Sequence, residues 1–546
     1  MKIPLAPVLF AGSLLWLTVV PPRLHAQEAA AASEPTGSTV PASHAVIVVW
    51  DGMRPDCISD EHTPTLARLA REGVNFARHH SVYPSSTEVN GTAMATGCYP
   101  GHSTLIGNRE YRPAVDPYRS FATEELAALR TADAATGGHY LRVPTLAEAL
   151  HAAGERTAIA STKPVVILHD RRQRPDAGAN LLAESVVLYG GNTLPETAAR
   201  ELEKRLGRPF PREIRLPNVE QDAWTTQALT RGLWRDGLPR LSVLWLSDPD
   251  FTQHRYGPLS PQALKALESD DANLGTVLTT LEERGWRAST DVFVVSDHGF
   301  STIGTQVDVA SELTKAGVEA VKEFRAEPRV GQLLSVGLGG SVFLYAVQHD
   351  PATIQRAVDV LQRSRFAGVV FTREDLPGTF PLRSVHLDAP EAPDIVVALR
   401  WEDVNNADGL PGTIYGDGER KPGQGTHATL SRYDLHNTLI ANGPSFRRGF
   451  RDELPSANTD LAPTITHLLG VSGLDGMDGR VLTEALANPS EPPATAPAAP
   501  RTETLRATRE EGGWRWEQVL QITRYAGVDY FDEGNAVPAP TAVDPR

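Results

Sequence analysis

The residues of this sequence best suited to chemistry are three aspartates that each come after a mostly apolar run. The runs cover residues 45–50, 241–246 and 292–295, and the aspartates are Asp51, Asp250 and Asp297. Such runs are typical of parallel strands buried on both faces, and open α/β sheets bind ligands at the carboxyl ends of their strands. Each aspartate alone is an ordinary turn or loop residue. Together they predict a group of carboxylates at one edge of a sheet.

Three of the 16 histidines fall in matching positions. They are His254, four residues after one aspartate; His298, directly after another; and His427, at the end of a glycine-rich loop expected over residues 409–425. Carboxylate oxygen and neutral imidazole nitrogen are ligands that suit zinc. A single Asp-His pair after a strand is more often an ordinary loop. Six such ligands are enough for two ions, and two ions can hold the attacking and leaving oxygens of an in-line displacement.

Thr87 is the candidate nucleophile for such a displacement. It stands between an extended run, residues 74–82, and a helix of small residues expected over residues 87–96. Unpaired backbone N–H groups and the positive end of the helix dipole lie there, so a hydroxyl ionises more easily and an anion finds donors. The alternative is that Thr87 is only an N-cap. The metal ligands expected at the same sheet edge favour a nucleophile that is deprotonated by coordination to a metal.

Two further polar residues are candidates for the active site, and each also has an ordinary structural interpretation. Asn108 closes a loop after the helix of Thr87, and its amide can donate to a phosphoryl oxygen, although a lone Asn is commonly a turn residue. Lys163 follows an expected strand over residues 156–160, and is otherwise a solvated residue at a strand end. Both positions are compatible with the sheet edge that carries the aspartates.

The elements that must position these residues alternate between strand and helix. This alternation with short links predicts a doubly wound, mostly parallel central sheet flanked by helices. Helices are expected at residues 143–153, 218–236, 261–285, 434–441 and 461–469. The alternation of strand and helix is lost over residues 300–424, which we expect to form a smaller inserted α+β subdomain. Residues 393–399 are expected to return from it to the main sheet.

The N-terminus predicts export. A basic residue, an apolar core and Leu24-His25-Ala26 are typical of a signal peptide cleaved after Ala26. The apolar core is shorter than a bilayer span, so an uncleaved anchor is the less favoured alternative. The expected segments are a signal peptide at 1–26, a disordered leader at 27–43, the catalytic α/β domain at 44–299 and 425–487, the insertion at 300–424, a Pro/Ala-rich linker at 488–512 and a tail at 513–546 that we expect to hold a hairpin.

Composition narrows the classes of function. The chain has 546 residues and a formal net charge of -15, which argues against general nucleic-acid binding, because such proteins usually carry a basic stripe. Hydrophobic residues at 41% and charged residues at 22% fit a soluble globular protein. We expect a periplasmic or secreted protein without stable membrane insertion after removal of the signal. Cys57 and Cys98 are too few for a cysteine-based zinc site; whether they form a disulfide, and the oligomeric state, are left open.

The sequence resembles the alkaline phosphatase superfamily, and within it the nucleotide pyrophosphatase/phosphodiesterase branch (type I phosphodiesterases). The resemblance runs in order over residues 44–485. Its motifs are Val48-Val49-Trp50-Asp51-Gly52-Met53-Arg54, Thr63-Pro64-Thr65-Leu66, Tyr83-Pro84-Ser85-Ser86-Thr87, Thr96-Gly97-Cys98-Tyr99-Pro100, Gly107-Asn108, Asp248-Pro249-Asp250 with His254, Ser296-Asp297-His298-Gly299, and Gly425-Thr426-His427.

The resemblance implies a role for each candidate residue. It implies two zinc ions, with the ligands Asp250, His254 and His427 for one ion and Asp51, Asp297, His298 and the Thr87 hydroxyl for the other. Thr87 would attack phosphorus and form phospho-threonine, which water activated at the first zinc would hydrolyse. Asn108 and the backbone N–H of Thr87 would hold the phosphoryl oxygens. The insertion would lie near the substrate as a cap.

Several positions depart from the family pattern. Glu88 stands where the family has an aromatic residue that helps stack a nucleobase, and Val89-Asn90-Gly91 replaces Pro-Asn-His. We expect Glu88 to border the substrate and to repel a second phosphate. Lys163 matches the lysine of a Lys-x-Arg pair in some related monoesterases, but Pro164-Val165 follow it. The Cys/Ser-x-Pro-x-Arg signature of sulfatases is absent.

These observations favour a secreted two-zinc phosphoric ester hydrolase of the phosphodiesterase/nucleotide pyrophosphatase type. Its substrate would be a small phosphate ester and not a nucleic acid duplex. An alkaline phosphomonoesterase, supported by Lys163, and a phosphonate monoester hydrolase are the alternatives among enzymes. A metal-binding pseudoenzyme with a partner in the cell envelope is the alternative outside them.

Overall fold

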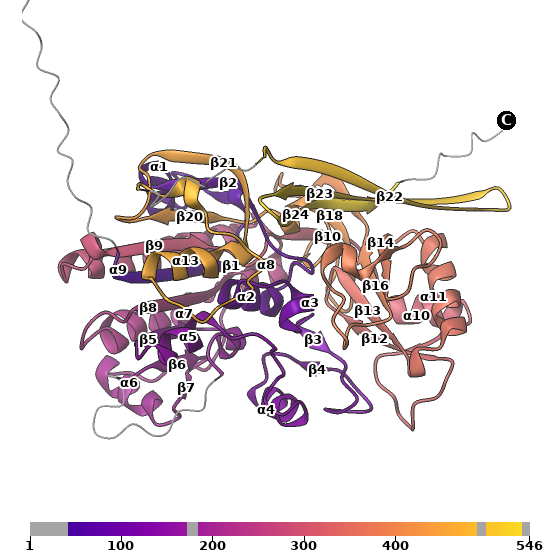
Figure 1. Ribbon diagram of the computed structural model, residues 1–546, viewed down its shortest axis with the longest axis horizontal. Coiled ribbons are helices and arrows are strands. Elements are labelled where there is room, and N and C mark those ends of the chain that lie inside the picture. The colour runs from indigo at the N-terminus through magenta and orange to yellow at the C-terminus, as the bar shows by residue number, and fades with distance from the viewer. Residues whose placement is uncertain (1–41, 172–183, 489–497, 538–546) are drawn as a thin grey trace, which may run out of the picture. The chain divides into compact units, whose positions relative to one another are not determined.

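A computed structural model describes residues 42–171, 184–488 and 498–537. Most of the expected signal peptide and leader lies outside these residues. The largest sheet has nine strands in the order β21-β2-β20-β9-β1-β8-β5-β6-β7 (Figure 1). Their bounds are β1 His44–Asp51, β2 Val74–His80, β5 Thr157–Ser161, β6 Val186–Tyr189, β7 Asn192–Leu194, β8 Leu241–Pro249, β9 Thr290–Val295, β20 Leu439–Asn442 and β21 Phe450–Ala457.

The central strand β1 shows why this sheet needs helices on both faces. Successive side chains of a strand point to opposite faces, and every residue of β1 after His44 is buried. Val46, Val48 and Trp50 pack in one apolar cluster with helices α1 (Pro64–Glu72), α7 (Val219–Gln227) and α9 (Pro261–Glu283). Ala45, Ile47 and Val49 pack in another with α2 (Thr87–Thr96), α5 (Leu146–Ala152) and α13 (Leu461–Leu469).

Strand direction brings the candidate residues to one edge. β1 is parallel to β8 and β9, and β5 and β6 continue the parallel set beyond β8. Asp51 is the last residue of β1, and Asp250 begins helix α8 (Asp250–Tyr256) directly after β8. Asp297 and Lys163 each lie two residues beyond the end of their strand. The predicted doubly wound, mostly parallel sheet is confirmed.

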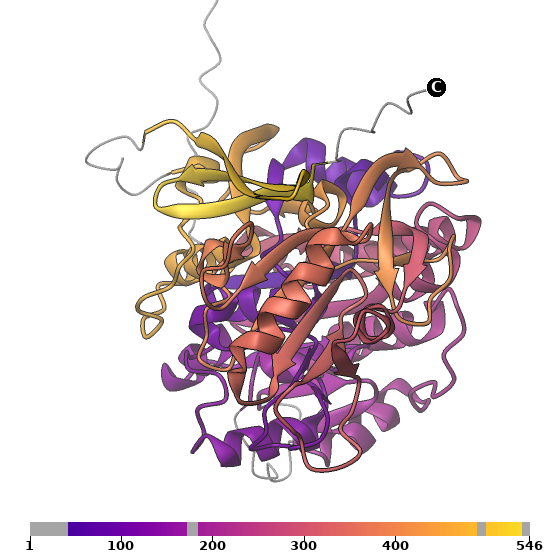
Figure 2. The ribbon, with the colours of Figure 1, turned by 90° about the vertical axis from the view of Figure 1, so that its right-hand side faces the viewer.

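Residues 319–399 contain a separate six-stranded sheet in the order β11-β12-β13-β16-β14-β15. The helix α11 (Pro351–Arg363) lies across it in Figure 2 and contacts β14 and β16. The bounds of its strands are β11 Glu319–Val321, β12 Gln332–Gly337, β13 Ser341–Ala346, β14 Ala367–Thr372, β15 Phe380–Pro381 and β16 Ile395–Leu399. The expectation that residues 393–399 return to the main sheet is wrong: β16 pairs antiparallel with β13 and β14, because its buried residues complete this sheet's own core.

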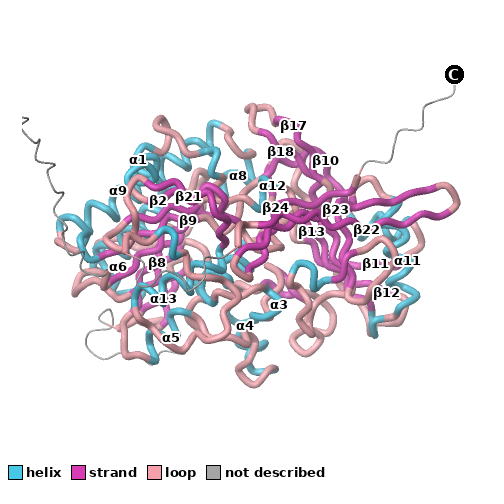
Figure 3. Tube along the Cα trace, turned by 45° about the horizontal axis from the view of Figure 1, so that its top comes forward, coloured by secondary structure: helices cyan, strands magenta, loops and turns pink. Residues whose placement is uncertain are grey.

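Three smaller sheets complete the described chain. The smallest pairs β3 (Arg109–Glu110) with β4 (Phe121–Ala122). The two larger ones can be followed in Figure 3. One has the order β17-β18-β10-β19, with bounds β10 Ser301–Val307, β17 Trp401–Asn405, β18 Pro411–Asp417 and β19 Gly425–Thr426. The expected loop over residues 409–425 therefore contains a strand. The other sheet is C-terminal, with bounds β22 Arg501–Glu511, β23 Trp514–Tyr525 and β24 Val528–Ala536. The hairpin expected in the tail is β23–β24, and β22 occupies residues that were expected to belong to the linker.

One helix expected near the end of the main domain is a strand. Residues 434–441 were predicted to be helical, but only α12 (Arg432–Leu435) is, and β20 follows at Leu439. β20 lies between β9 and β2 and is antiparallel to both. Its apolar residues Leu439, Ile440 and Ala441 are buried among neighbours on the sheet, and this packing outweighs their helical propensity.

Two features of the chain are plain from the described residues. The thiols of Cys57 and Cys98 are both buried and both free, so they form no disulfide. Among the described helices, none combines the length and the apolar character that a bilayer span requires.

The buried strands of the main sheet carry its stability. Leu244 of β8 is fully buried, so Leu244→Ala should reduce the free energy of unfolding by about 2–5 kcal/mol, because the truncation leaves a cavity. Val404 of β17 is 52% exposed and serves as control; Val404→Ala should change the same quantity by less than about 0.5 kcal/mol. Urea titrations followed by tryptophan fluorescence measure both, and equal losses for the two variants would contradict this packing.

Candidate active site

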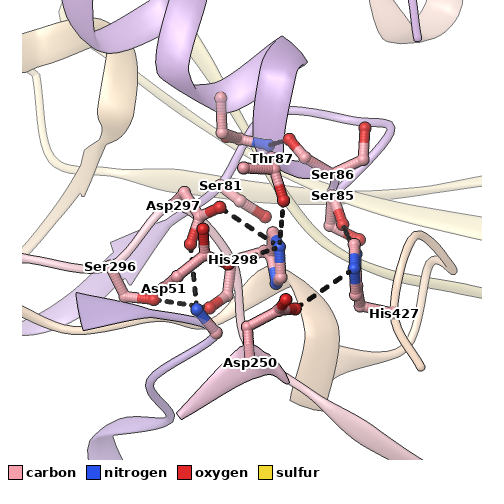
Figure 4. A network of polar contacts seen from close by, with 12 residues as sticks. Asp51, Ser81, Ser85, Ser86, Thr87, Asp250, Ser296, Asp297, His298 and His427 are labelled. Carbon is pink, nitrogen blue, oxygen red and sulfur yellow. Dashed lines mark hydrogen bonds and ion pairs between the residues drawn. The ribbon is translucent and has the colours of Figure 1, made fainter. Parts of the chain in front are cut away.

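One group of side chains at the sheet edge consists of two aspartates and a histidine (Figure 4). His298 Nε2 lies 3.2 Å from Asp297 Oδ2 and 3.7 Å from Asp51 Oδ1. All three residues are fully buried. Their ligand atoms lie within 4.8 Å of one another, which is close enough for a single metal ion.

A second group lies against the first. His254 Nε2 is 3.2 Å and His427 Nε2 is 3.6 Å from the same oxygen, Asp250 Oδ1. The rings of His427 and His298 stack at 3.6 Å between centroids, and Asp250, His298 and His427 are also mutually within 4.8 Å. His298 therefore lies between the two groups. The structure brings together all six ligands that the sequence singled out.

The three histidines share one orientation. Each Nδ1 lies 2.8–2.9 Å from a backbone carbonyl oxygen and donates to it; the pairs are His254 with Gly425, His298 with Gly299, and His427 with Ser85. A backbone carbonyl accepts only, so this contact fixes the proton on Nδ1 and turns the Nε2 lone pair toward the aspartates. Burial lowers the pKa of His254 and holds that of His427 well below the usual range. Neutral imidazoles in this orientation are the form that binds metal.

The carboxylates give an independent test of whether metal ions fit here. Asp51 Oδ1, Asp250 Oδ1 and Asp297 Oδ2 are buried and have no hydrogen-bond partner among the described residues. A buried charged oxygen without a partner is costly. Burial, followed by the charge of Asp297, raises the pKa of Asp51 well above its ordinary value. Divalent cations would satisfy all three oxygens, so the residues present fit such ions.

Lys163 is placed inside this site. Its Nζ lies 2.9 Å from Asp51 Oδ2 and 3.0 Å from Asp250 Oδ2, and its side chain is 7% exposed. Burial alone would lower the pKa of Lys163, but these carboxylates outweigh burial and raise it well above the ordinary value. The ammonium group therefore bridges one aspartate of each group, and the solvated strand-end alternative does not hold.

Thr87 lies over the first group at the N-terminal end of α2. It is 2% exposed, and its Oγ1 is 3.2 Å from His298 Nε2. Since His298 Nδ1 carries the proton, the Thr87 hydroxyl donates to Nε2. The helix begins at Thr87, as predicted, and Ser86 precedes it in an extended conformation without a side-chain cap. A threonine oxygen is thus aimed into the metal-binding groups at a helix N-terminus.

Asn108 and Glu88 border Thr87. Asn108 Oδ1 accepts a hydrogen bond of 3.2 Å from the Glu88 N–H, which leaves the Asn108 amide donor for another partner. Glu88 is 3% exposed, and its Oε2 has no partner among the described residues. Burial and then the neighbouring Glu124 raise the pKa of Glu88 well above its usual range. The charge repulsion expected from the sequence is correspondingly weakened.

Four polar residues that hold the site in place were not singled out from the sequence. Trp245 Nε1 donates to Asp51 Oδ2 at 2.7 Å, and Asn458 Nδ2 donates to the Asp297 carbonyl at 2.7 Å. The remaining two are Asn90, whose side chain bonds to the backbone of Val82, Pro84 and Ser86, and Gln253, whose amide donates to the Gly52 carbonyl. Asn90 is the one residue of Val89-Asn90-Gly91 that keeps the Pro-Asn-His pattern of the family, and this match was a sequence signal that could have singled it out.

Comparisons with known proteins identify the family of this chain. Residues 45–413 match the family model described as type I phosphodiesterase / nucleotide pyrophosphatase. Venom phosphodiesterase 2 of Crotalus adamanteus is 24% identical over 265 residues, which are 47% of this chain and 27% of that protein. The chain thus spans about a quarter of the length of the venom enzymes that it matches. Ectonucleotide pyrophosphatase/phosphodiesterase family member 7 of Mus musculus is 21% identical over 80% of this chain and 85% of that protein.

Solved structures support the fold. Murine ectonucleotide pyrophosphatase/phosphodiesterase 5, an inactive form in complex with AMP, superimposes with a TM-score of 0.56 at 17% sequence identity. The superposition covers 82% of this chain and all of that one. At this identity the likeness concerns the fold alone. Since the family model matches well over half of the 546 residues, the chain belongs to the type I phosphodiesterase/nucleotide pyrophosphatase family.

Proposed function

We propose that the protein is a hydrolase of small phosphodiesters or nucleotide pyrophosphates that works through a phospho-threonine intermediate on Thr87. The observation that carries the proposal is the Thr87 hydroxyl, which is buried, begins a helix and lies 3.2 Å from His298 Nε2 beside three unsatisfied carboxylate oxygens. Family membership supports the reaction type. Residues 1–26, which the structure does not describe, support a periplasmic or secreted location.

Metal ions would be held by the six ligands together with the Thr87 oxygen. Two zinc ions fit the oxygen and nitrogen donor set. One would use Asp250, His254 and His427, and the other would use Asp51, Asp297, His298 and Thr87. When bound, such ions stabilise negative charge on the attacking and leaving oxygens of the displacement.

The residues of this chain then define two displacements at phosphorus. In the first, the Thr87 hydroxyl gives its proton to water and its Oγ1 forms a bond to phosphorus. The bond from phosphorus to the leaving oxygen breaks, and that oxygen takes up a proton from water and departs as the alcohol. In the second, water attacks the phosphorus, the bond to Thr87 Oγ1 breaks, and the hydroxyl is restored. The Asn108 amide and the backbone N–H of Thr87 would hold the non-bridging oxygens, since donors placed where negative charge develops stabilise the transition state.

A phosphomonoesterase is the second candidate, and Lys163 is the reason. A monoester carries one more negative charge than a diester, and a buried ammonium group at the metal ligands is placed to offset it. Against this candidate, the relatives reported above are named as phosphodiesterases. Glu88 in place of an aromatic residue removes a stacking surface, so the alcohol group of the substrate need not be a nucleoside.

Removal of the nucleophile is the first test. Thr87→Ala should reduce turnover of a nitrophenyl phosphodiester by on the order of 10³-fold or more, because no oxygen remains to attack. Thr87→Ser keeps an oxygen and should retain measurable turnover. Ser86→Ala is the matched control. The Ser86 hydroxyl is next to Thr87 in sequence but has no hydrogen-bond partner in the described structure, so its loss should leave turnover unchanged. Unchanged turnover in Thr87→Ala would contradict the mechanism.

Metal removal is the second test. Dialysis against a chelator should abolish turnover, and added Zn²⁺ should restore it, because the three unsatisfied carboxylate oxygens would again have partners. Circular dichroism of the metal-free protein controls for unfolding. Full activity in protein shown by elemental analysis to be metal-free would overturn the metal assignment.

Lys163 separates the two candidate substrates. Lys163→Met should lower turnover of an aryl phosphomonoester by about tenfold or more relative to an aryl phosphodiester, because the monoester brings one more negative charge into the site than the diester does. We expect the unmodified protein to prefer the diester in steady-state measurements of kcat/KM. A wild-type preference for the monoester by orders of magnitude would make the phosphomonoesterase the correct assignment.

A further inference from the structure

A second group of potential metal ligands lies away from the active site, where the C-terminal sheet meets the main sheet. His80 is the last residue of β2, His436 directly follows α12, and Asp532 belongs to β24. One ligand atom from each lies within 4.8 Å of the others. The three residues lie far apart in sequence, so only the packing of β24 on the main domain brings them together (Figure 1).

His80 repeats the orientation of the active-site histidines. Its Nδ1 donates to the carbonyl oxygen of Ser456 at 3.0 Å, which leaves Nε2 as the free nitrogen. His80 is fully buried, and Nε2 has no hydrogen-bond partner among the described residues. Metal-bound histidines commonly donate their other ring nitrogen to a backbone carbonyl in this way.

The free nitrogen of His80 faces an acceptor. His80 Nε2 lies 3.4 Å from Asp532 Oδ1. In neutral His80, a nitrogen lone pair and a carboxylate oxygen would oppose each other, which is unfavourable in a buried place. A positive charge between His80 Nε2 and Asp532 Oδ1 would remove this repulsion. It can be either a proton on His80 or a metal ion.

The distance suits a metal ion. In a tetrahedral zinc site, with bonds of about 2.0–2.2 Å, neighbouring ligand atoms are separated by about 3.4 Å. His436 stands edge-on to His80, with 4.5 Å between ring centroids and 73° between ring planes. Burial lowers the pKa of His436 to about 3, so His436 has a ring nitrogen lone pair to offer.

The second oxygen of Asp532 is already satisfied. Thr523 Oγ1 donates to Asp532 Oδ2 at 2.7 Å and fixes the carboxylate, so that Oδ1 points to the histidines. Arg78 is the one competing cation nearby that the described contacts show. Its Nη2 lies 3.5 Å from Oδ1, a long contact, and its side chain is 34% exposed, so it can turn to solvent without a buried charge being left behind.

We propose that His80, His436 and Asp532 form an additional site for a divalent cation of the zinc type, with water completing its coordination. The ion would fasten β24 of the C-terminal sheet to the end of β2. Its role would be structural, because none of the three residues contacts Thr87 or the six ligands of the candidate active site in the described contacts. The proposal of this site is therefore independent of the proposed catalytic function.

Metal content tests the site directly. The full chain is saturated with ZnCl₂, passed through a desalting column and analysed for zinc by mass spectrometry. His436→Ala should retain one zinc equivalent fewer per chain than wild type, with phosphodiester turnover within twofold. His467→Ala, which removes an exposed histidine on α13, is the matched control and should retain the wild-type amount. Equal zinc content in His436→Ala and wild type would overturn the proposal and leave a proton as the species between His80 and Asp532.

A measurement on unmodified protein guards against misfolding of the variant. Crystals of the zinc-saturated wild-type protein should show an anomalous difference peak at the zinc edge between His80, His436 and Asp532. The absence of a peak there, in crystals that show one at any other zinc ligand group, would also overturn the proposal.

Discussion

The constraint on which the rest of the structure depends is the burial of three carboxylates at one edge of a sheet. Asp51, Asp250 and Asp297 each present an oxygen without a donor to the same buried space. A fold that places them there is unfavourable by itself, because charged groups without partners lose their hydration. Extensive apolar packing on both faces of β1 offsets this cost and keeps the strands in register. Cation binding would therefore relieve an electrostatic cost at the site, and the apolar packing of the sheet offsets that cost when no cation is bound.

Backbone carbonyl groups orient the three histidines for cation binding. Each of the three uses a carbonyl from a loop to hold Nδ1, so the sheet edge and the loops together decide which nitrogen is free. His298 Nε2 then has two uses, as a ligand atom for either group and as the acceptor for the Thr87 hydroxyl. A nucleophile held by a residue that also belongs to the metal groups couples its reactivity to metal binding, since an ion at Nε2 would displace the hydroxyl proton.

The sequence sufficed for whatever depends on local pattern and failed where partners are distant. Apolar runs, interrupted only by Ser242 in the second, predicted β1, β8 and β9 with the aspartates at or after their ends, and α2 and α13 were predicted with the bounds that the structure has. Residues 439–441 were read as helix because the pattern lacks the information that β9 and β2 flank them. Lys163 was a candidate from its position alone, and the solvated alternative stayed open, since only the three-dimensional packing of β5 beside β8 brings it between two aspartates.

Charge balance gives an argument about the substrate that no single residue gives. With the three aspartates counted as ionised ligands and the histidines as neutral ones, the aspartates and Lys163 leave two net negative charges. Glu88, whose pKa burial raises, is left out of this count. Two divalent ions would turn this into two net positive charges, and ionisation of Thr87 would leave one. A diester, with one negative charge, then makes the loaded site neutral, whereas a monoester with two would leave it negative in a buried space of low dielectric. If Glu88 ionises as well, the imbalance for a monoester grows. The same ammonium group that suggests a monoesterase is thus the group that makes a diester fit, because it offsets the third aspartate.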